Sequence, residues 1–156
     1  MKTLQLISHS AAETKKIGRI LAKFLKAGDV VALEGGLGAG KTTLVKGIAK
    51  GLGVASERAV SSPTFVLVHE YHGREKIFHL DWYRLKSLAD TDADLAGECF
   101  ALPAVTLVEW PERGEDILPM RRWRIRMSHR GPMSRRLVVS PPRDVDPAVL
   151  RDLRSA

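Results

Sequence analysis

The segment VVALEGGLGAGKTT, residues 30–43, decides how the rest of the chain is interpreted. It begins with an unbroken apolar run that meets glycines, which is typical of a central strand buried on both faces of a sheet. The pattern G-x-x-x-x-G-K-[ST] is then matched by Gly35, Gly40, Lys41 and Thr42. Beyond it, apolar residues recur at helical spacing until glycines end the helix at residues 51–53. Strand, glycine-rich turn and amphipathic helix in this order predict a phosphate-binding loop rather than a flexible surface turn.

Each residue type in this loop has a chemical task. Glycines allow backbone conformations that turn successive N–H groups inward, where they and the positive end of the following helix bind phosphate oxygens. The Lys41 ammonium can reach the β and γ phosphates as a point charge, and the Thr42 hydroxyl can ligate Mg²⁺. The chain has no N-K-x-D segment of the kind that reads guanine. We therefore predict ATP with Mg²⁺ as the ligand.

Two carboxylates follow hydrophobic runs that we predict as strands. IFHLD ends in Asp81 and VTLVE ends in Glu109, and in open α/β sheets ligands bind beyond the carboxyl ends of the strands. A magnesium-dependent phosphate site needs such an acid. One of the two could hold magnesium while the other orients the attacking water, and the pattern does not assign these roles. The alternative for either residue is a solvated acid at the end of a strand.

Strand-like patterns recur along the whole chain. They occur at residues 3–8, 30–36, 64–71, 76–85, 104–110, 121–128 and 135–140. The strands at 64–71 and 76–85 flank a short turn, HGRE, so we expect them to form an antiparallel hairpin.

Helical patterns separate several of these strands. A capping-box spacing from Ser10 to Glu13 opens a helix that ends before Gly28, and residues 87–102 are weakly helical. Asp146 and a proline after it precede a short final helix. We expect one domain over residues 1–156 with an α/β fold like that of P-loop NTPases. Its mainly parallel central sheet is flanked by helices and has an antiparallel section.

Composition and charge narrow the class of protein. The chain is 44% hydrophobic, which is ordinary for a globular domain, and has a formal charge of +7 with a pI near 9.9. This charge favours anionic partners such as nucleotides, nucleic acid or an acidic protein surface. Cys99 is the only cysteine, so no internal disulfide can form, and we predict a small buried side chain. No segment approaches the ~20 apolar residues of a membrane span, so we expect a cytoplasmic protein without membrane contact.

From about residue 119 the chain becomes basic. The arginine segment, residues 119–140, contains no acid and seven arginines: Arg121, Arg122, Arg124, Arg126, Arg130, Arg135 and Arg136. In a strand, residues 122, 124 and 126 would share one face and form a cationic ridge. Such a ridge could meet nucleic-acid phosphates or an acidic partner, or it could be a solvated face that favours solubility.

Four segments, in this order and spacing, resemble the bacterial TsaE family, also called YjeE: GGLGAGKTT, SSPTFVLVHEY, FHLDWYRL and LVEWPERGEDILP. The phosphate loop alone is generic to many NTPases, whereas the other three segments make the resemblance specific. It covers residues 10–118 and is weak after Pro119. The resemblance implies the ATPase component of the machinery that makes threonylcarbamoyladenosine (t6A) beside the anticodon of tRNAs reading ANN codons.

The resemblance also implies roles for single positions. Thr42 and Glu109 would be the magnesium ligands, and Lys41, Asp81 and Thr64 would serve hydrolysis, with Thr64 in a switch-like loop after Ser62 and Pro63. The nucleotide would be contacted by Leu37, Gly38, Ala39, Gly40, Lys41, Thr42, Thr43 and Trp110, and its base or ribose by Ala11 and Arg135.

Packing is the alternative for the aromatic residues, and it is our prediction for Trp82. His69, His72 and His79 have no metal-ligand partners at useful spacing, so we predict structural or solvent roles for all three.

The family resemblance implies partners as well. TsaE proteins work with the TsaB and TsaD pair, in which TsaD transfers the threonylcarbamoyl group, and tRNA would be reached through that complex. No cis arginine is identifiable next to the motifs, so a site completed by a partner would have weak activity alone. Two alternatives remain: a small P-loop kinase of a metabolite, and an RNA-binding protein that a nucleotide regulates.

Overall fold

The computed structural model describes residues 2–63, 66–86 and 89–156, in which the strands form one sheet. The strands are β1 (Leu4–Ser8), β2 (Val30–Gly35), β3 (Val68–His72), β4 (Lys76–Asp81), β5 (Val105–Glu109), β6 (Trp123–His129) and β7 (Arg135–Ser140). The helices are α1 (Ala11–Ala22), α2 (Lys41–Gly51), α3 (Asp90–Ala101) and α4 (Ala148–Arg154), with short 3₁₀ turns η1 (Glu57–Ala59) and η2 (Pro111–Gly114).

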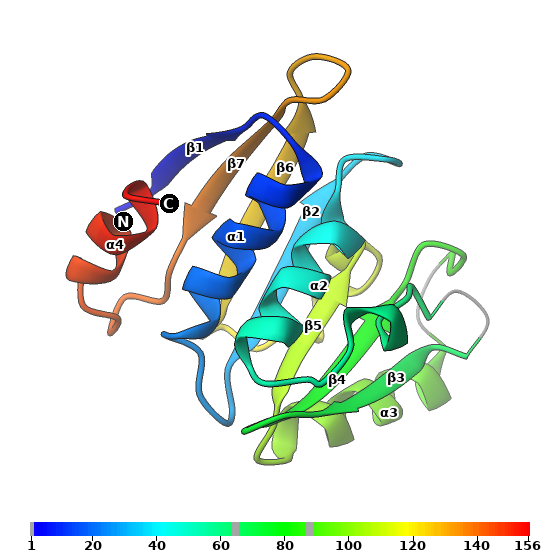
Figure 1. Cartoon of the computed structure of the whole chain (residues 1–156). Helices are drawn as coiled ribbons and strands as arrows, with labels where there is room; N and C mark the ends of the chain where they lie inside the picture. The colour runs from blue at the N-terminus through cyan, green and yellow to red at the C-terminus, as the bar shows by residue number, and fades with distance from the viewer. Residues whose placement is uncertain (1, 64–65, 87–88) are drawn as a thin grey trace.

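The strand order across the sheet is β1-β7-β6-β2-β5-β4-β3 (Figure 1). The central pairings of β6 with β2, β2 with β5 and β5 with β4 are parallel. The pairings toward both edges, β1 with β7, β7 with β6 and β4 with β3, are antiparallel. The predicted P-loop-type α/β class is therefore confirmed, with its antiparallel pairs at the two edges. Since β2, β4 and β5 are parallel, their carboxyl ends meet at one edge of the sheet.

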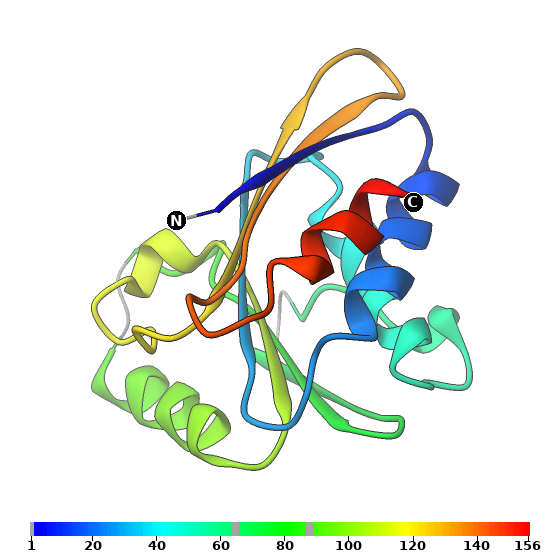
Figure 2. The ribbon, with the colours of Figure 1, turned by 90° about the vertical axis from the view of Figure 1, so that its left-hand side faces the viewer.

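Helices cover both faces of the sheet. α1, α2 and α4 lie on one face, and α3 lies on the other (Figures 1 and 2). Side chains of β2 alternate between two apolar clusters, because successive residues of a strand point to opposite faces. Val31 and Leu33 belong to the cluster beneath α1 and α2, whereas Val30 and Ala32 belong to the cluster beneath α3. This double burial explains the unbroken apolar run before the glycines.

Helices α1 and α2 approach each other closely because glycines lie at their contact. A Cβ atom on Gly47 would lie 2.3 Å from the backbone oxygen of Lys15, and one on Gly18 would lie 2.7 Å from that of Leu44. Neither distance is compatible with a side chain there. The contact therefore holds α2 against α1, and the first residues of α2 directly follow the phosphate loop.

The first helix begins as predicted and ends early. The Ser10 hydroxyl accepts a hydrogen bond from the Glu13 N–H at 3.0 Å, and the Glu13 carboxylate accepts one from the His9 N–H at 2.6 Å. The helix ends at Ala22 rather than near Gly28, because the next three N–H groups donate to carbonyls three residues back and tighten the last turn.

The hairpin is confirmed with shorter strands than predicted. β3 begins at Val68, just after Leu67, whose φ of 45° is incompatible with an extended strand. β4 ends at Asp81 and not at residue 85, because the Leu85 N–H closes a turn onto the Trp82 carbonyl at 3.0 Å. The final helix begins at Ala148 with Pro147 as its N-cap, one position later than predicted, and the Asp146 side chain accepts the Ala148 N–H at 2.8 Å.

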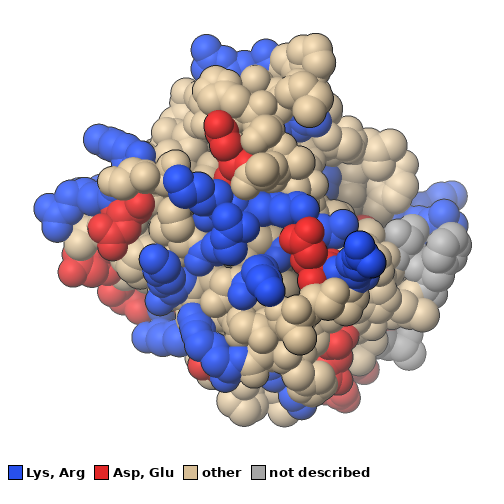
Figure 3. Space-filling view, viewed as in Figure 1, with Lys and Arg blue, Asp and Glu red and all other residues tan. Residues whose placement is uncertain are grey.

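The arginine segment contains both β6 and β7, as predicted, and four of its seven arginines pair with acids from elsewhere in the chain: Arg121, Arg122, Arg124 and Arg126. Glu115 contacts Arg122 and Arg124, and Glu34 on β2 contacts Arg124 and Arg126. The cationic ridge is thus partly neutralised, which the segment's own sequence did not show. A second basic surface lies over α1 and α2 (Figure 3), from Lys15, Lys16, Arg19, Lys23, Lys46 and Lys50.

Among the described residues, no helix combines the length and apolar character needed to cross a bilayer.

Candidate functional site

The phosphate loop connects the carboxyl end of β2 to the amino end of α2 and follows the predicted conformation. Gly38 and Gly40 have φ values of 74° and 100°, in a region that residues other than glycine rarely adopt. Gly40 is the N-cap of α2 and offers no side-chain hydrogen bond to the first turn. The N–H groups of this turn are therefore available to an anion, with the positive end of the helix behind them.

Lys41 is folded back onto this loop. Its Nζ donates hydrogen bonds to the carbonyl oxygens of Gly35 at 2.5 Å and Gly36 at 2.9 Å, and it lies 4.2 Å from the ring centroid of Trp110. Burial lowers the pKa of the ammonium, while the negative charges of Glu109, Asp81 and Glu112 oppose this shift. A bound phosphate would add further negative charge directly beside this buried ammonium.

Thr42 and Glu109 come together from distant parts of the sequence. The Thr42 hydroxyl donates toward both carboxylate oxygens of Glu109, at 3.1 Å and 3.2 Å. Glu109 ends β5 and is only 3% exposed. Hydroxyl and carboxylate oxygens are ligands that Mg²⁺ prefers, so the pair fits the ion that the loop's chemistry calls for.

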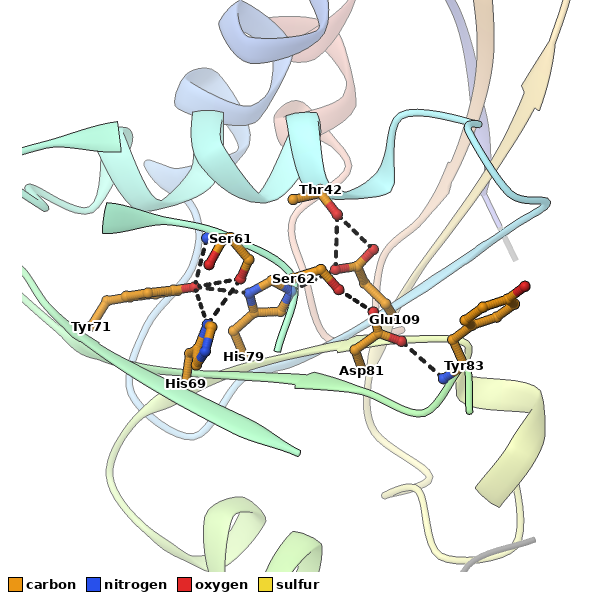
Figure 4. Close-up of polar contacts among 9 residues, drawn as sticks. All are labelled: Thr42, Ser61, Ser62, His69, Tyr71, His79, Asp81, Tyr83 and Glu109. Carbon is orange, nitrogen blue, oxygen red and sulfur yellow. Dashed lines mark hydrogen bonds and ion pairs between the residues drawn. The ribbon is translucent and has the colours of Figure 1, made fainter. Parts of the chain in front are cut away.

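Asp81 ends β4 directly beside Glu109, its partner in the register of the two parallel strands. It has different neighbours from Glu109 (Figure 4). One carboxylate oxygen accepts the Tyr83 N–H at 2.9 Å, and the other accepts the Ser62 hydroxyl. The structure thus brings both predicted acids to the loop and surrounds them differently. Thr64, also predicted for hydrolysis, lies outside the described residues.

A cavity of about 430 Å³ collects most of the predicted residues. It is lined by Leu37, Gly38, Ala39, Gly40, Lys41, Thr42, Thr43, Ser62, Asp81, Tyr83, Glu109, Trp110 and Arg135. Ala11 is absent from this lining and lines a smaller hollow of about 90 Å³, which shares Gly40, Thr43 and Arg135 with the larger one. Ala11 therefore lies beside the main cavity rather than in it.

Arg135 reaches the phosphate loop from β7, almost one hundred positions away in sequence. One of its terminal nitrogens donates to the Gly38 carbonyl at 3.3 Å, and the other donates to the Ser134 carbonyl at 3.0 Å. The family resemblance implied that Arg135 contacts the base or ribose, and the antiparallel return of β7 brings its side chain beside the loop.

Trp110 and Tyr83 form an aromatic pair at the cavity, with ring centroids 4.9 Å apart. Trp110 adopts φ 59°, which is uncommon for a residue other than glycine, and directs its ring toward Lys41. Trp82, by contrast, is 2% exposed and packs in the cluster beneath α3. The predicted packing role of Trp82 is therefore confirmed, whereas Trp110 faces the cavity.

His79 is the residue whose place at the site sequence reasoning missed. It is fully buried, with Nε2 2.6 Å from a Glu109 carboxylate oxygen and Nδ1 3.1 Å from the Tyr71 hydroxyl. A signal was present, since His79 and Asp81 are two positions apart on one strand and so share a face. The described residues contain no group of three or more His, Cys, Asp or Glu side chains that could hold a metal ion together.

Comparisons with known proteins give the family of this chain. A model of the family described as threonylcarbamoyl adenosine biosynthesis protein TsaE matches residues 8–137. The chain belongs to the TsaE family. The resemblance in the four motifs is thereby confirmed, and the matched region extends through β6 into β7.

Two TsaE relatives are each 44% identical to this chain, and both are called tRNA threonylcarbamoyladenosine biosynthesis protein TsaE. The protein from Treponema pallidum aligns over 116 residues, 74% of this chain and 84% of the relative. The protein from Bacillus subtilis aligns over 133 residues, 84% of this chain and 81% of the relative. The crystal structure of Bacillus subtilis YdiB superposes with a TM-score of 0.77 at 33% identity, covering 97% of this chain and 94% of that one. Membership in the TsaE family places this chain in t6A biosynthesis.

Proposed function

We propose that the chain binds ATP with Mg²⁺ and hydrolyses it as an accessory component of t6A synthesis. The observation that carries this proposal is the convergence of Lys41, Thr42, Asp81 and Glu109 on one cavity beside the phosphate loop. A family role in t6A biosynthesis supplies the process that hydrolysis would serve. A cytoplasmic location belongs to the same proposal.

Residues of the loop would hold the triphosphate. The N–H groups at the start of α2 would bind phosphate oxygens, and Lys41 would exchange the carbonyls of Gly35 and Gly36 for the β and γ phosphates. Thr42 and Glu109 would hold magnesium, which when bound neutralises charge on the phosphates. The short distance between these two side chains supports that assignment.

Asp81 would position the attacking water. Its carboxylate lines the cavity, and its partners are Ser62 and the backbone of Tyr83 rather than Thr42. A carboxylate held beside the metal ligand, and not bonded to it, suits orientation of a water molecule. Thr64 keeps its proposed part in hydrolysis on the family resemblance alone.

The remaining predicted residues would contact the rest of the nucleotide. Trp110 and Tyr83 present aromatic surface to the cavity, and Arg135 lies across the loop near Gly38. Ala11 would approach the ribose or base through the neighbouring hollow, which shares Arg135 with the main cavity.

Slow turnover by the isolated chain is part of the proposal. Phosphoryl transfer is accelerated strongly by a cation at the transferring group. Arg135 donates to carbonyls at Gly38 and Ser134, so its guanidinium is engaged with the protein backbone. We propose that homologues of TsaB and TsaD complete the site, and that tRNA is reached through their complex.

The decisive experiment measures ATP hydrolysis and t6A formation in the same reactions. The purified chain is assayed alone, and then with TsaB and TsaD homologues from the same organism and their tRNA. Hydrolysis should be slow alone, rise with the partners, and convert one round of modification into many. Lys41→Ala should abolish productive ATP binding and both effects.

Two results would refute the proposal. Hydrolysis and modification that are the same with and without the chain would remove the accessory role. Transfer of the γ-phosphate to a metabolite without partners would indicate the kinase alternative. The pairing of the arginine segment with Glu34 and Glu115 gives no support to an arginine lid or to an RNA-binding ridge.

A further inference from the structure

The dipeptide Ser61–Ser62 is linked to both acids of the site, to Asp81 by a direct hydrogen bond and to Glu109 through two other side chains (Figure 4). Ser62 donates its hydroxyl hydrogen bond directly to Asp81. Ser61 meets the Tyr71 hydroxyl through two backbone groups, with its N–H at 3.3 Å and its carbonyl oxygen at 3.1 Å. The second route continues through the interior of the protein toward Glu109.

This interior route consists of buried side chains. The Tyr71 hydroxyl lies 3.1 Å from His79 Nδ1, and His79 Nε2 lies 2.6 Å from a Glu109 oxygen. Tyr71 is 6% exposed and His79 is fully buried. In a low-dielectric interior an unpaired polar group costs free energy. Breaking one of these hydrogen bonds therefore favours rearrangement of the others.

The donors and acceptors of these side chains determine which group donates at each hydrogen bond between Tyr71, His79 and Glu109. A carboxylate only accepts, so the imidazole of His79 must place an N–H on the nitrogen that faces Glu109. In the neutral ring the other nitrogen is then an acceptor, and the Tyr71 hydroxyl is positioned to donate to it. Burial raises the pKa of Tyr71, so the hydroxyl keeps the proton that it donates.

The Tyr71 hydroxyl has only one proton for two acceptors. When it donates to His79 it cannot donate to the Ser61 carbonyl, although its oxygen can still accept the Ser61 N–H. His69 Nδ1 lies 2.9 Å from the same carbonyl and can donate to it instead. With its proton on His79, the Tyr71 hydroxyl holds Ser61 by accepting the Ser61 N–H, and the position of that hydroxyl depends on how Glu109 engages the imidazole of His79.

We propose that Tyr71 and His79 are positioning residues that couple the Glu109 carboxylate to the Ser61–Ser62 backbone. The inference rests on the proposed magnesium site, because Mg²⁺ would engage Glu109 and Thr42 at the other end of the chain. Glu109 then keeps its orientation through His79, and the ordered chain holds Ser61. Loss of the nucleotide and metal frees Glu109 to rearrange and loosens the dipeptide. Since the hydrogen-bonded side chains couple the two ends in this proposal, thermodynamic linkage predicts that removing one of their contacts lowers the affinity gained from the metal.

Tyr71→Phe tests this coupling because it removes the hydroxyl and keeps the ring. The dissociation constant of a non-hydrolysable ATP analogue is measured with and without Mg²⁺ by calorimetry. Hydrogen exchange of the segment that contains Ser61 is followed under the same conditions. We expect analogue binding without Mg²⁺ to be unchanged, the affinity gained from Mg²⁺ to fall by about fivefold or more, and metal-dependent protection of Ser61 to disappear.

His79→Gln should likewise reduce the affinity gained from Mg²⁺ more than the affinity for the analogue alone. It serves as a second variant if Tyr71→Phe is poorly folded. His72→Gln is the control on the same hairpin, since His72 is exposed and pairs with Glu70 at its surface. Thermal unfolding of each variant shows that the comparison is made on folded protein.

The outcomes separate the two proposals. A full gain from Mg²⁺ in both variants, or an equal loss of affinity with and without the metal, overturns the coupling and leaves the magnesium site standing. If the wild-type chain gains no affinity from Mg²⁺, the magnesium site itself fails and this inference fails with it.

Discussion

At the scale of single residues, the site is built from groups that each have more than one partner. Glu109 contacts Thr42 and His79, whereas Asp81 contacts Ser62 and the backbone of Tyr83. Although the two carboxylates are neighbours in the sheet register, these partners give them different chemistry. The proposed division into a metal ligand and a water-orienting group follows from that difference.

Glu109→Gln and Asp81→Asn should therefore have different effects. Loss of the Glu109 charge should weaken Mg²⁺ binding by at least the roughly 10- to 100-fold that removing a hydrogen-bond partner of a metal ligand typically costs. Asp81→Asn should leave metal binding nearly intact and lower the rate of hydrolysis by about 100-fold or more. Magnesium titrations of nucleotide binding, together with single-turnover hydrolysis, measure both quantities. Identical effects of the two substitutions would contradict the assignment.

Cys99 gives a second prediction at this scale. It is 4% exposed in the cluster beneath α3, and burial raises the pKa of its thiol. A raised pKa means less thiolate at any given pH, and the thiolate is the form that reacts. Modification by a chromogenic disulfide reagent should be slow in the native protein and complete in denaturant. Fast reaction of the folded chain would show that the Cys99 side chain of α3 is not buried against the sheet.

At the scale of elements, the contact of α1 with α2 determines where the phosphate loop lies. Gly18 and Gly47 let the two backbones approach closely, and the second of these helices begins at Lys41. The helical periodicity predicted both helices, but it did not predict which of their faces would meet. That choice depends on the absence of side chains at the contact.

Gly47→Ala should destabilise the protein because its new methyl group would lie 2.3 Å from the Lys15 backbone oxygen. Forced overpacking of this kind typically costs about 1–3 kcal/mol. Gly97→Ala on α3 is the matched control, since a Cβ there meets no atom within 4 Å. It should stabilise the helix by about 0.5–1 kcal/mol. Urea unfolding of both variants checks the opposite signs, and equal stabilities would contradict the packing.

At the scale of the whole molecule, Arg121 ties together three segments that are far apart in sequence. Its guanidinium contacts Asp29, just before β2, at 2.7 Å and Asp144, after β7, at 2.9 Å. Asp29 is 2% exposed, so its carboxylate needs this partner. The contact joins the amino end of the central strand to the carboxyl-terminal part of the chain.

Arg121→Met should lower stability in a pH-dependent way. Hydrogen bonds from Arg121 lower the pKa of Asp144 below its ordinary 3.8. The folded state thus binds fewer protons than the unfolded state in acid. The stability from this pair is present above about pH 3.8 and is lost as the pH falls through the lowered value. Urea unfolding should show a larger difference from wild type at pH 7 than at pH 3, and no such change for Arg130→Met.

The sequence by itself determined the parts of the protein that depend on local patterns. The apolar run before Gly35 and the glycine-lysine pattern after it predicted β2, the phosphate loop and α2, because burial and backbone freedom are encoded at neighbouring positions. Asp81 and Glu109 were predicted at strand ends for the same reason. Four motifs identified the TsaE family, which the family model confirms.

Only the tertiary structure decided which distant residues meet. Arg135 reaches Gly38 because β7 returns antiparallel to β6, and the arginines of β6 find Glu34 because β6 lies beside β2. His79 meets Glu109 and Tyr71 because β4 lies between β3 and β5. The physical reason is that strand order is set by the packing of both faces of the sheet at once, which no local pattern in the chain records.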